Sequence, residues 1–394
     1  MAILGDVSMS RIIYISSARL TDKALRDSYI EYCLGKGASV EYWDIVSLVR
    51  KAHEEQGALA PSYLRRIKSY KEFESLLCLP ENERAIYVIL LSYTHRFRKP
   101  FRLLSKYNCR MVNFSYGAMP RPLGRGIAYR LLGEPARFAR TVAGIIFGSI
   151  YRKLNLVKRY DLAFVAGQAL MSINQYAAKV VQYNHYDYEL YRRASVTSEH
   201  LIEGKYAVFL DANAPYHSDL EIVGLEPLNP DVYFKSLNRL FCMIEKSLDL
   251  KVVIAGNPRS RYGCEVYENR EFHRLRTADL VKGAEFVILH QSTALNYAVL
   301  NLKPVLFVYT DEMMRMYKIA VVREMEALAS YLNATIYNVD QITDSSQIVV
   351  KMPDRERYDS YKYSYITSRE SESLSSAEIF WREIDLSGSS CGRG

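Results

Sequence analysis

Three short apolar runs in the second half of the chain constrain its fold more than any other feature of the sequence. They are Val252–Ala255, Phe286–Leu289 and Val305–Val308. Each is rich in β-branched or aromatic residues and lacks polar alternation, which indicates strands covered on both faces. The segments Thr277–Lys282 and Ser292–Leu300 lie between them and have the apolar spacing of buried helices. Strands alternating with helices predict a parallel sheet.

Polar side chains follow the first two of these strands. Those after the first are Asn257, Pro258 and Arg259, and those after the second are His290, Gln291, Ser292 and Thr293. Open α/β sheets bind ligands outside the carboxyl ends of their strands. The sequence therefore predicts a ligand site at this edge.

Further apolar runs extend the pattern to both halves of the chain. The opening segments Arg11–Ser16, Thr21–Leu34 and Ser39–Trp43 predict strand, helix and strand. The other predicted strands are Ile86–Leu91, Met111–Phe114, Leu162–Ala166, Val180–Tyr183, Tyr206–Leu210 and Thr335–Val339, and the other predicted helices are Phe101–Lys106, Val232–Ser247 and Glu312–Leu332. No GxGxxG sequence follows a strand directly, so a dinucleotide site is not predicted.

The chain is long enough for two α/β domains, because it has 394 residues, of which 49% are hydrophobic. We predict an N-terminal domain over 1–200 and a C-terminal domain over 201–350. The remaining tail, 351–394, contains a helical pattern at Ser373–Ile384 that suits a return to the first domain. The six cysteines lack metal-ligand spacing and no apolar run is long enough to span a bilayer, so we expect a cytoplasmic protein without structural zinc.

Positive charge is concentrated in residues 96–159, which contain fifteen Lys and Arg and one acid, Glu134. The rest of the chain has 37 basic and 43 acidic residues. In this segment apolar residues alternate with arginines, and one interpretation is an amphipathic hairpin on an anionic membrane surface or acceptor. The other is an ordinary helix pair with solvated arginines. The arginines concerned include Arg125, Arg130, Arg137 and Arg140. No recognisable nucleic-acid-binding module is present.

Several polar residues allow both a chemical and a structural interpretation. Asp211 ends a predicted strand and is either a general base or a loop carboxylate that caps a turn. Ser292 and Thr293 stand at a predicted helix start, where a hydroxyl can cap the helix, bind phosphate or do both. His290 is either a donor ligand or a core histidine. His185, with Asp187 and Glu189, suits a metal site less well than a polar strand end that leads into a linker.

The order of these motifs resembles a known family. VFLD, VVIAGNPRS and VILHQSTALNYAVLNLKPVLF look like the nucleotide-binding domain of bacterial GT-B glycosyltransferases that make surface polysaccharides of the capsule and lipopolysaccharide. The similarity is in particular to sialyl- and Kdo-transferases, which use CMP-activated sugars. The resemblance covers about residues 205–310. It implies an α/β GT-B fold with two Rossmann-like domains facing each other across a cleft.

The resemblance also implies roles for individual residues. Asp211 corresponds to the carboxylate of the family's acidic catalytic motif, Asn257 and Pro258 to its HP motif, and Ser292 and Thr293 to its Ser/Thr motif. The last two motifs contact the nucleotide in that family. Asn257 departs from the pattern, because the family has His there and Asn cannot carry positive charge to the leaving phosphate. Either Arg259, Arg261 or His290 then supplies that charge, or the donor differs from the one that the resemblance implies.

The expected activity is therefore an inverting, metal-independent transfer of a sugar from a nucleotide-activated donor to a hydroxyl of a surface glycan or glycolipid. No cofactor is expected, and the protein is expected to be peripheral on the inner face of the cytoplasmic membrane. One alternative is a UDP-sugar 2-epimerase-like enzyme. Another is a non-catalytic assembly protein with the GT-B fold, which the Asn257 departure favours.

Overall fold

The chain divides into two compact units, which a computed structural model describes over residues 10–49, 59–120, 154, 156–171, 177–197, 201–216 and 227–389. The first unit takes in residues up to Tyr116, a stretch that ends at Asn184, and the C-terminal part from Ser368. The second consists mainly of His185–Thr367. The chain thus passes from the first unit to the second at 184–185 and back at 367–368, where the predicted boundaries were 200 and 350, and residues 117–120 also belong to the second unit.

The first unit is built on a parallel sheet of seven described strands. Their order is β3-β2-β1-β4-β5-β6-β7, so the chain starts inside the sheet and winds outward in both directions. The strands are β1 (Arg11–Ser16), β2 (Ser39–Asp44), β3 (Leu64–Arg66), β4 (Ile86–Leu90), β5 (Arg110–Ser115), β6 (Tyr160–Ala166) and β7 (Ala177–Tyr183).

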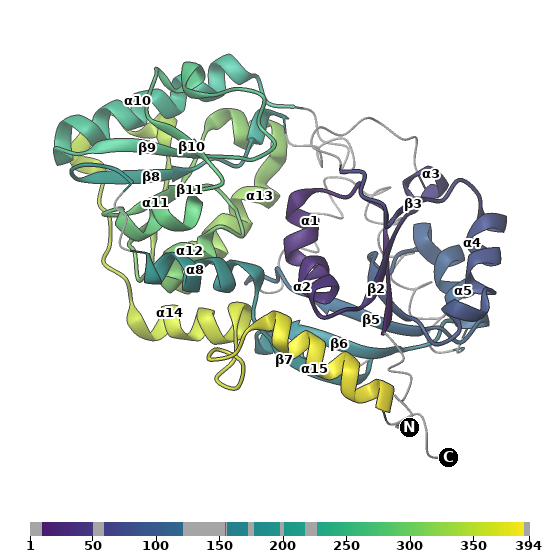
Figure 1. The fold of residues 1–394 in the computed structure, drawn as a ribbon. Coiled ribbons are helices and arrows are strands. Elements are labelled where there is room, and N and C mark those ends of the chain that lie inside the picture. Colours follow the sequence, from purple (N-terminus) through teal and green to yellow (C-terminus); the bar gives the residue numbers. More distant parts are fainter. Residues whose placement is uncertain are drawn as a thin grey trace. The chain divides into compact units, whose positions relative to one another are not determined.

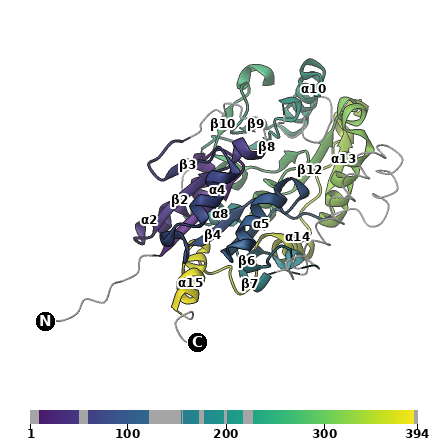
Figure 2. The same cartoon turned by 90° about the vertical axis from the view of Figure 1, so that its right-hand side faces the viewer.

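Helices cover both faces of this sheet (Figures 1 and 2). Ile13 and Ile15 of β1 pack with the layer of α4 (Tyr70–Leu77) and α5 (Arg98–Lys106). Ile12 and Tyr14 pack with the opposite layer, which contains α1 (Asp22–Asp27), α2 (Ile30–Gly35) and α15 (Ser376–Ser389). Successive side chains of a strand point to opposite faces. Both faces of β1 are therefore apolar because each is covered by helices. The short helix α3 (Val46–Val49) follows β2.

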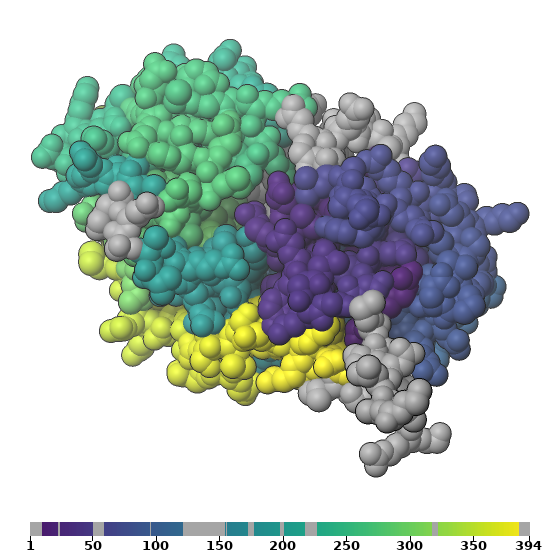
Figure 3. All heavy atoms as spheres, viewed as in Figure 1, coloured from purple at the N-terminus to yellow at the C-terminus, as the bar shows by residue number. Residues whose placement is uncertain are grey.

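The C-terminal helix α15 completes the core of the first unit. Its residues Ile379, Phe380 and Ile384 are at most 2% exposed. The Phe380 ring lies 5.1 Å from that of Phe114 and 5.3 Å from that of Phe164, which belong to β5 and β6. Figure 3 shows this yellow C-terminal segment beside the purple N-terminal one. The last part of the chain thus returns to the sheet with which the chain begins.

The second unit contains a parallel sheet of six described strands in the order β10-β9-β8-β11-β12-β13. They are β8 (Tyr206–Leu210), β9 (Lys251–Gly256), β10 (Phe272–Arg274), β11 (Val287–Leu289), β12 (Val305–Tyr309) and β13 (Thr335–Asn338). The first strand, β8, is central. The chain runs outward through β9 and β10 and then returns to the other side of β8 at β11. This reversal is a topological switch point between β8 and β11.

Two helix layers enclose the second sheet. One contains α10 (Pro230–Leu248) and part of α13 (Asp311–Leu332). The other contains α8 (Tyr186–Val196), α11 (Thr277–Gly283), α12 (Leu295–Leu300) and α14 (Arg355–Tyr361). Helix α8 packs against α11 and α12, which explains why the second unit begins before residue 200.

Three predicted elements differ in the structure. The predicted helix Thr21–Leu34 is two helices, because Tyr29 has a left-handed φ of 58° and turns its ring toward Phe114 and Phe380. The predicted helix Ser292–Leu300 begins only at Leu295. His185 caps a helix rather than continuing a strand.

The four arginines proposed for acceptor or membrane contact, Arg125, Arg130, Arg137 and Arg140, lie outside the described residues. Within the described ranges, no helix is both long enough and apolar enough to cross a membrane.

Candidate functional site

The switch point of the second sheet brings the predicted site residues to one edge. Asp211 directly follows β8, Asn257 follows β9 and His290 follows β11. The register pairs Leu210 with Leu289, so Asp211 and His290 begin adjacent loops. This edge is where ligands bind in open sheets of this topology.

Asp211 is a buried carboxylate held by three hydrogen-bond donors. It is 7% exposed. The backbone N–H of Asn213 donates to its Oδ1 at 2.8 Å, and that of Asn257 donates to its Oδ2 at 3.2 Å. The Tyr262 hydroxyl bridges both oxygens at 3.0 and 3.1 Å. Asp211 therefore ties the loops after β8 and β9 together.

The electrostatics of this cluster favour a basic carboxylate and a protonated phenol. Burial raises the pKa of the Asp211 carboxyl above its usual value, while its hydrogen bonds act in the opposite direction. Burial, followed by the negative charge of Asp211, raises the pKa of Tyr262. Tyr262 consequently remains a hydrogen-bond donor to the carboxylate. A carboxylate with a raised pKa is a stronger base than one exposed to water.

Tyr262 is a site residue that the sequence analysis missed. It lies in the polar connection after β9, which has neither strand nor helix periodicity. In the sequence, only the position of Tyr262 soon after Arg259 and Arg261 distinguishes it from other tyrosines. A contact between two loops cannot be derived from such spacing.

The Asn257 side chain shapes the turn after β9. Its Oδ1 accepts the backbone N–H of Arg259 at 2.9 Å, an Asx-turn that suits the following proline. Pro258, Arg259 and Arg261 are exposed. Neither arginine side chain makes a hydrogen bond or ion pair with any residue that the structure describes. Two positive charges that have no partner among the described residues thus lie on the loop after β9, which is hydrogen-bonded to Asp211.

His290 is a buried histidine whose two ring nitrogens both have protein partners. The Val308 carbonyl can only accept, so Nδ1 donates to it, at 2.5 Å. Nε2 must then accept the Tyr233 hydroxyl, at 2.8 Å. The residue is 2% exposed, and burial lowers its pKa to about 4. This geometry is that of a neutral core histidine and leaves no ring nitrogen for a donor ligand, contrary to the ligand role considered from the sequence.

Ser292 and Thr293 lie in a turn that precedes α12. The Ser292 hydroxyl accepts the backbone N–H of Ala294 at 3.2 Å, so it acts as a local cap. Thr293 is exposed and Ser292 is half-buried. Helix α12 has only six residues and begins at Leu295, so Ser292 and Thr293 do not stand at the first turn of a helix. The helix-start phosphate site expected from the sequence is therefore not formed by these two residues. The two hydroxyls still lie on the loop after β11.

His185 and Asp187 join a buried network instead of a strand face. The Asp187 carboxylate accepts the Tyr297 hydroxyl at 3.0 Å and the Asn296 amide at 3.0 Å. These bonds fasten α8 to α12, immediately after the loop of Ser292. Among the described residues, no group of His, Cys, Asp and Glu has the arrangement of a metal site.

Comparison with known proteins relates this geometry to solved structures. No protein-family model matches the chain, and no curated protein matches it. The wall teichoic acid polymerase TagF superposes with a TM-score of 0.51 at 10% identity, covering 96% of this chain and 87% of that one. S. aureus MnaA in complex with UDP gives 0.50 at 13% identity, covering 96% and 97%. The calicheamicin glycosyltransferase CalG4 gives 0.48 at 10% identity, covering 97% and 95%.

At these identities, the likeness shows the fold alone. Both sheets are parallel, both have helices on their two faces, and the arrangement matches the two-domain GT-B fold of the structural neighbours. The predicted α/β class with two Rossmann-like domains is confirmed.

Proposed function

We propose that this protein is a glycosyltransferase that uses a nucleotide-activated sugar donor. The observation that carries the proposal is the pair of exposed arginines, Arg259 and Arg261, beside the buried Asp211 at the switch point of a GT-B-type sheet. A donor phosphate needs positive charge or backbone N–H groups. The acceptor hydroxyl needs a base. This edge offers both.

The reaction we propose is an inverting transfer. Asp211 removes the proton of the acceptor hydroxyl, and that oxygen attacks the sugar carbon as the bond to the donor phosphate breaks. Arg259 and Arg261 stabilise the negative charge on the departing nucleotide, taking over the charge that Asn257 cannot carry. Ser292, Thr293 and the turn at Asn257 and Pro258 contact the nucleotide. This chemistry needs no resident metal or cofactor.

Asp211 reaches its substrate by exchanging a hydrogen bond. In the structure its two oxygens accept two backbone N–H groups and the Tyr262 hydroxyl. The backbone bonds fix the carboxylate, whereas a tyrosine hydroxyl can be displaced by an acceptor hydroxyl. We propose that the acceptor takes the place of Tyr262 on one carboxylate oxygen during the reaction.

The finer identity of the substrates rests on the motif resemblance. It favours a CMP-activated nonulosonate or Kdo-type sugar as the donor and a surface glycan or glycolipid as the acceptor. The arginine-rich segment that contains Arg125, Arg130, Arg137 and Arg140 supports contact with an anionic membrane at the cytoplasmic face. We propose that the enzyme is peripheral there and makes capsule or lipopolysaccharide.

Hydrolysis of the donor tests the activity without knowledge of the acceptor. The purified protein is incubated with CMP-, UDP- and GDP-sugars, and the released nucleotide is measured. We expect release from the CMP-sugar, which Asp211→Asn lowers by about 100-fold or more, in the range of general-base catalysis. Arg259→Gln should also lower the release, because it removes positive charge from the departing nucleotide. Its matched control is Arg66→Gln, which removes an exposed arginine on β3 of the first unit and should release nucleotide as the wild type does. Full activity in Asp211→Asn contradicts the catalytic assignment.

A uridine nucleotide is the second candidate, because MnaA was solved with UDP and shares the fold. A UDP-sugar 2-epimerase-like enzyme would change the sugar's configuration with no acceptor present. Sugar analysis by NMR after incubation with UDP-sugars distinguishes this activity from transfer. Binding without release or epimerisation of any donor would instead support a non-catalytic assembly protein.

A further inference from the structure

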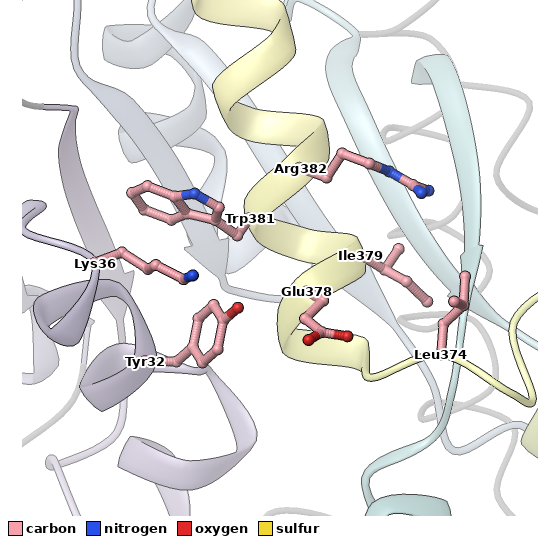
Figure 4. Close-up of a pocket in the computed structure, with 7 residues that line it drawn as sticks. All are labelled: Tyr32, Lys36, Leu374, Glu378, Ile379, Trp381 and Arg382. Atoms are coloured by element: carbon pink, nitrogen blue, oxygen red, sulfur yellow. The ribbon is translucent and has the colours of Figure 1, made fainter.

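A small cavity lies on the first unit, between α2 and the C-terminal helix α15 (Figure 4). It has a volume of about 300 Å³ and is lined by Tyr32, Lys36, Leu374, Glu378, Ile379, Trp381 and Arg382. Ile30 and Cys33 of α2 share a core with Ile379 and Phe380 of α15, so both helices are fixed on the same face of the sheet. The cavity walls are therefore set by the fold of this unit.

Four of the lining side chains bring unused hydrogen-bonding groups to the cavity. They are the Tyr32 hydroxyl, the Lys36 ammonium, the Glu378 carboxylate and the Trp381 indole N–H. None of these groups makes a hydrogen bond with another residue in the described part of the chain. Figure 4 shows Tyr32, Lys36 and Trp381 on one side of α15, Glu378 at the first turn of that helix, and Arg382 pointing the other way. Arg382 also lies 3.7 Å from Glu383 as an ion pair.

The charges in the cavity restrict what it can bind. The Lys36 ammonium lies over the Tyr32 ring, 5.4 Å from its centroid, and so already occupies the position that a cationic ligand would take. The Glu378 carboxylate offsets the charge of the Lys36 ammonium, so these two groups together offer no net positive charge to a phosphate or carboxylate. A neutral ligand with hydroxyl groups suits both charges.

The aromatic side chains narrow the ligand further. Tyr32 and Trp381 are half-buried, and Trp381 makes no ring-to-ring contact with another aromatic side chain among the described residues. A pyranose ring has an apolar face of C–H groups that stacks on an aromatic ring, and its hydroxyls project outward to carboxylate and ammonium groups. The volume is at the lower end of the range for ligand pockets, which suits one ring of a longer chain.

We propose that this cavity binds a pyranose residue of a neutral glycan. Trp381 stacks on the sugar ring, and Glu378 and Lys36 hydrogen-bond to its hydroxyls. The site belongs to the first unit, whereas the candidate donor site belongs to the second. It therefore does not depend on the proposed transfer reaction.

Tryptophan fluorescence offers a direct test, because the chain has two tryptophans, Trp43 and Trp381, and Trp43 is fully buried in the core. The probes are maltohexaose, chitohexaose and the charged control hexagalacturonate. We expect a neutral hexasaccharide to change the emission with a Kd of about 1 mM. Saturation-transfer NMR, which does not rely on the indole signal, measures binding by the variants.

Variants of the cavity side chains distinguish sugar binding from a role of these side chains in stability alone. Trp381→Ala should weaken binding about 10-fold or more, as loss of one stacking contact in a small site implies. Glu378→Gln, at an exposed position, should weaken it several-fold while leaving unfolding unchanged. Arg382→Gln on the same helix should bind as the wild type does. Asp211→Asn should also keep glycan binding, whatever its effect on transfer.

Three results would overturn the proposal. They are no binding of either neutral hexasaccharide at about 10 mM, equal binding by Glu378→Gln and the wild type, and tighter binding of hexagalacturonate than of the neutral probes. Either of the first two results would show that the cavity does not bind a glycan. The third would show that its ligand is not neutral.

Discussion

Acidification should destabilise the second unit through His290, since the structure keeps this side chain neutral. Its Nδ1–H donates to the Val308 carbonyl and its Nε2 accepts the Tyr233 hydroxyl. Burial lowers its pKa from 6.5 to about 4. In the unfolded chain, His290 binds a proton below pH 6.5 that the native state excludes. The free energy of unfolding therefore rises with pH across this window. The contribution of His290 to it is lost as the pH falls from 6.5 toward 4.

The size of this effect follows from the pKa shift. One pKa unit corresponds to about 1.4 kcal/mol, so the shift corresponds to about 3 kcal/mol of stability when the pH has fallen below the native pKa. His290→Asn removes the titration and retains an amide N–H that can donate to Val308. We expect this variant to be less stable than the wild type near neutral pH, because the hydrogen bond from the Tyr233 hydroxyl to Nε2 is lost.

Urea unfolding at a series of pH values measures the difference between wild type and variant. Carboxylates elsewhere in the chain titrate in both proteins and cancel in this difference. We expect the wild-type advantage to shrink by about 3 kcal/mol between about pH 7 and about pH 4. His290→Gln is a second non-titrating variant. If the difference in unfolding free energy between wild type and variant stays constant within about 0.5 kcal/mol over the whole pH range, His290 is not a buried neutral histidine.

Other contacts give predictions of their own. Tyr262→Phe removes a hydrogen bond that lowers the pKa of Asp211, so the acidic limb of the donor-hydrolysis pH profile should move to higher pH. An unchanged limb would mean that Asp211 is not the titrating base. Phe380→Ala should cost about 3–5 kcal/mol of stability, measured by urea unfolding, because it opens a cavity in the aromatic core of the first unit. A loss below about 1 kcal/mol would show that α15 is not packed as described. Tyr297→Phe should cost about 2 kcal/mol, because it takes a donor from the buried Asp187 carboxylate. Equal urea midpoints for variant and wild type would contradict that network.

The apolar strands could be predicted from the sequence because their signal is local. β1 and β8 occupy the predicted residues, and the other predicted strands differ at their ends by a few residues. Burial on both faces makes such runs continuous and apolar. The edge strands β3 and β10 were missed, since three residues with partly exposed side chains carry no such pattern.

The site was predictable only in outline, because its chemistry depends on contacts between loops. Because Asp211 and Asn257 each follow a predicted strand, the sequence predicts that both lie at the same edge of the sheet. The register of β8 and β9 brings these two residues together. The bond from Tyr262 to Asp211 and that from Tyr233 to His290 join residues that are far apart in the sequence. The turn before α12 likewise follows from local hydrogen bonds of Ser292 that apolar spacing does not reveal.

The most direct test of the central claim is nucleotide binding at the edge of the second sheet. Thermal unfolding of the full chain is followed with CMP, UDP and GDP, in the wild type and in an Arg259→Gln/Arg261→Gln double variant. A ligand that binds only the native state, at a concentration of about 100 times its Kd, adds about 2.7 kcal/mol to the free energy of unfolding and so raises the melting temperature. We predict that CMP gives the largest rise and that the double variant loses it. If no nucleotide shifts the wild-type melting temperature, or if the double variant responds as the wild type does, the proposed donor site is contradicted.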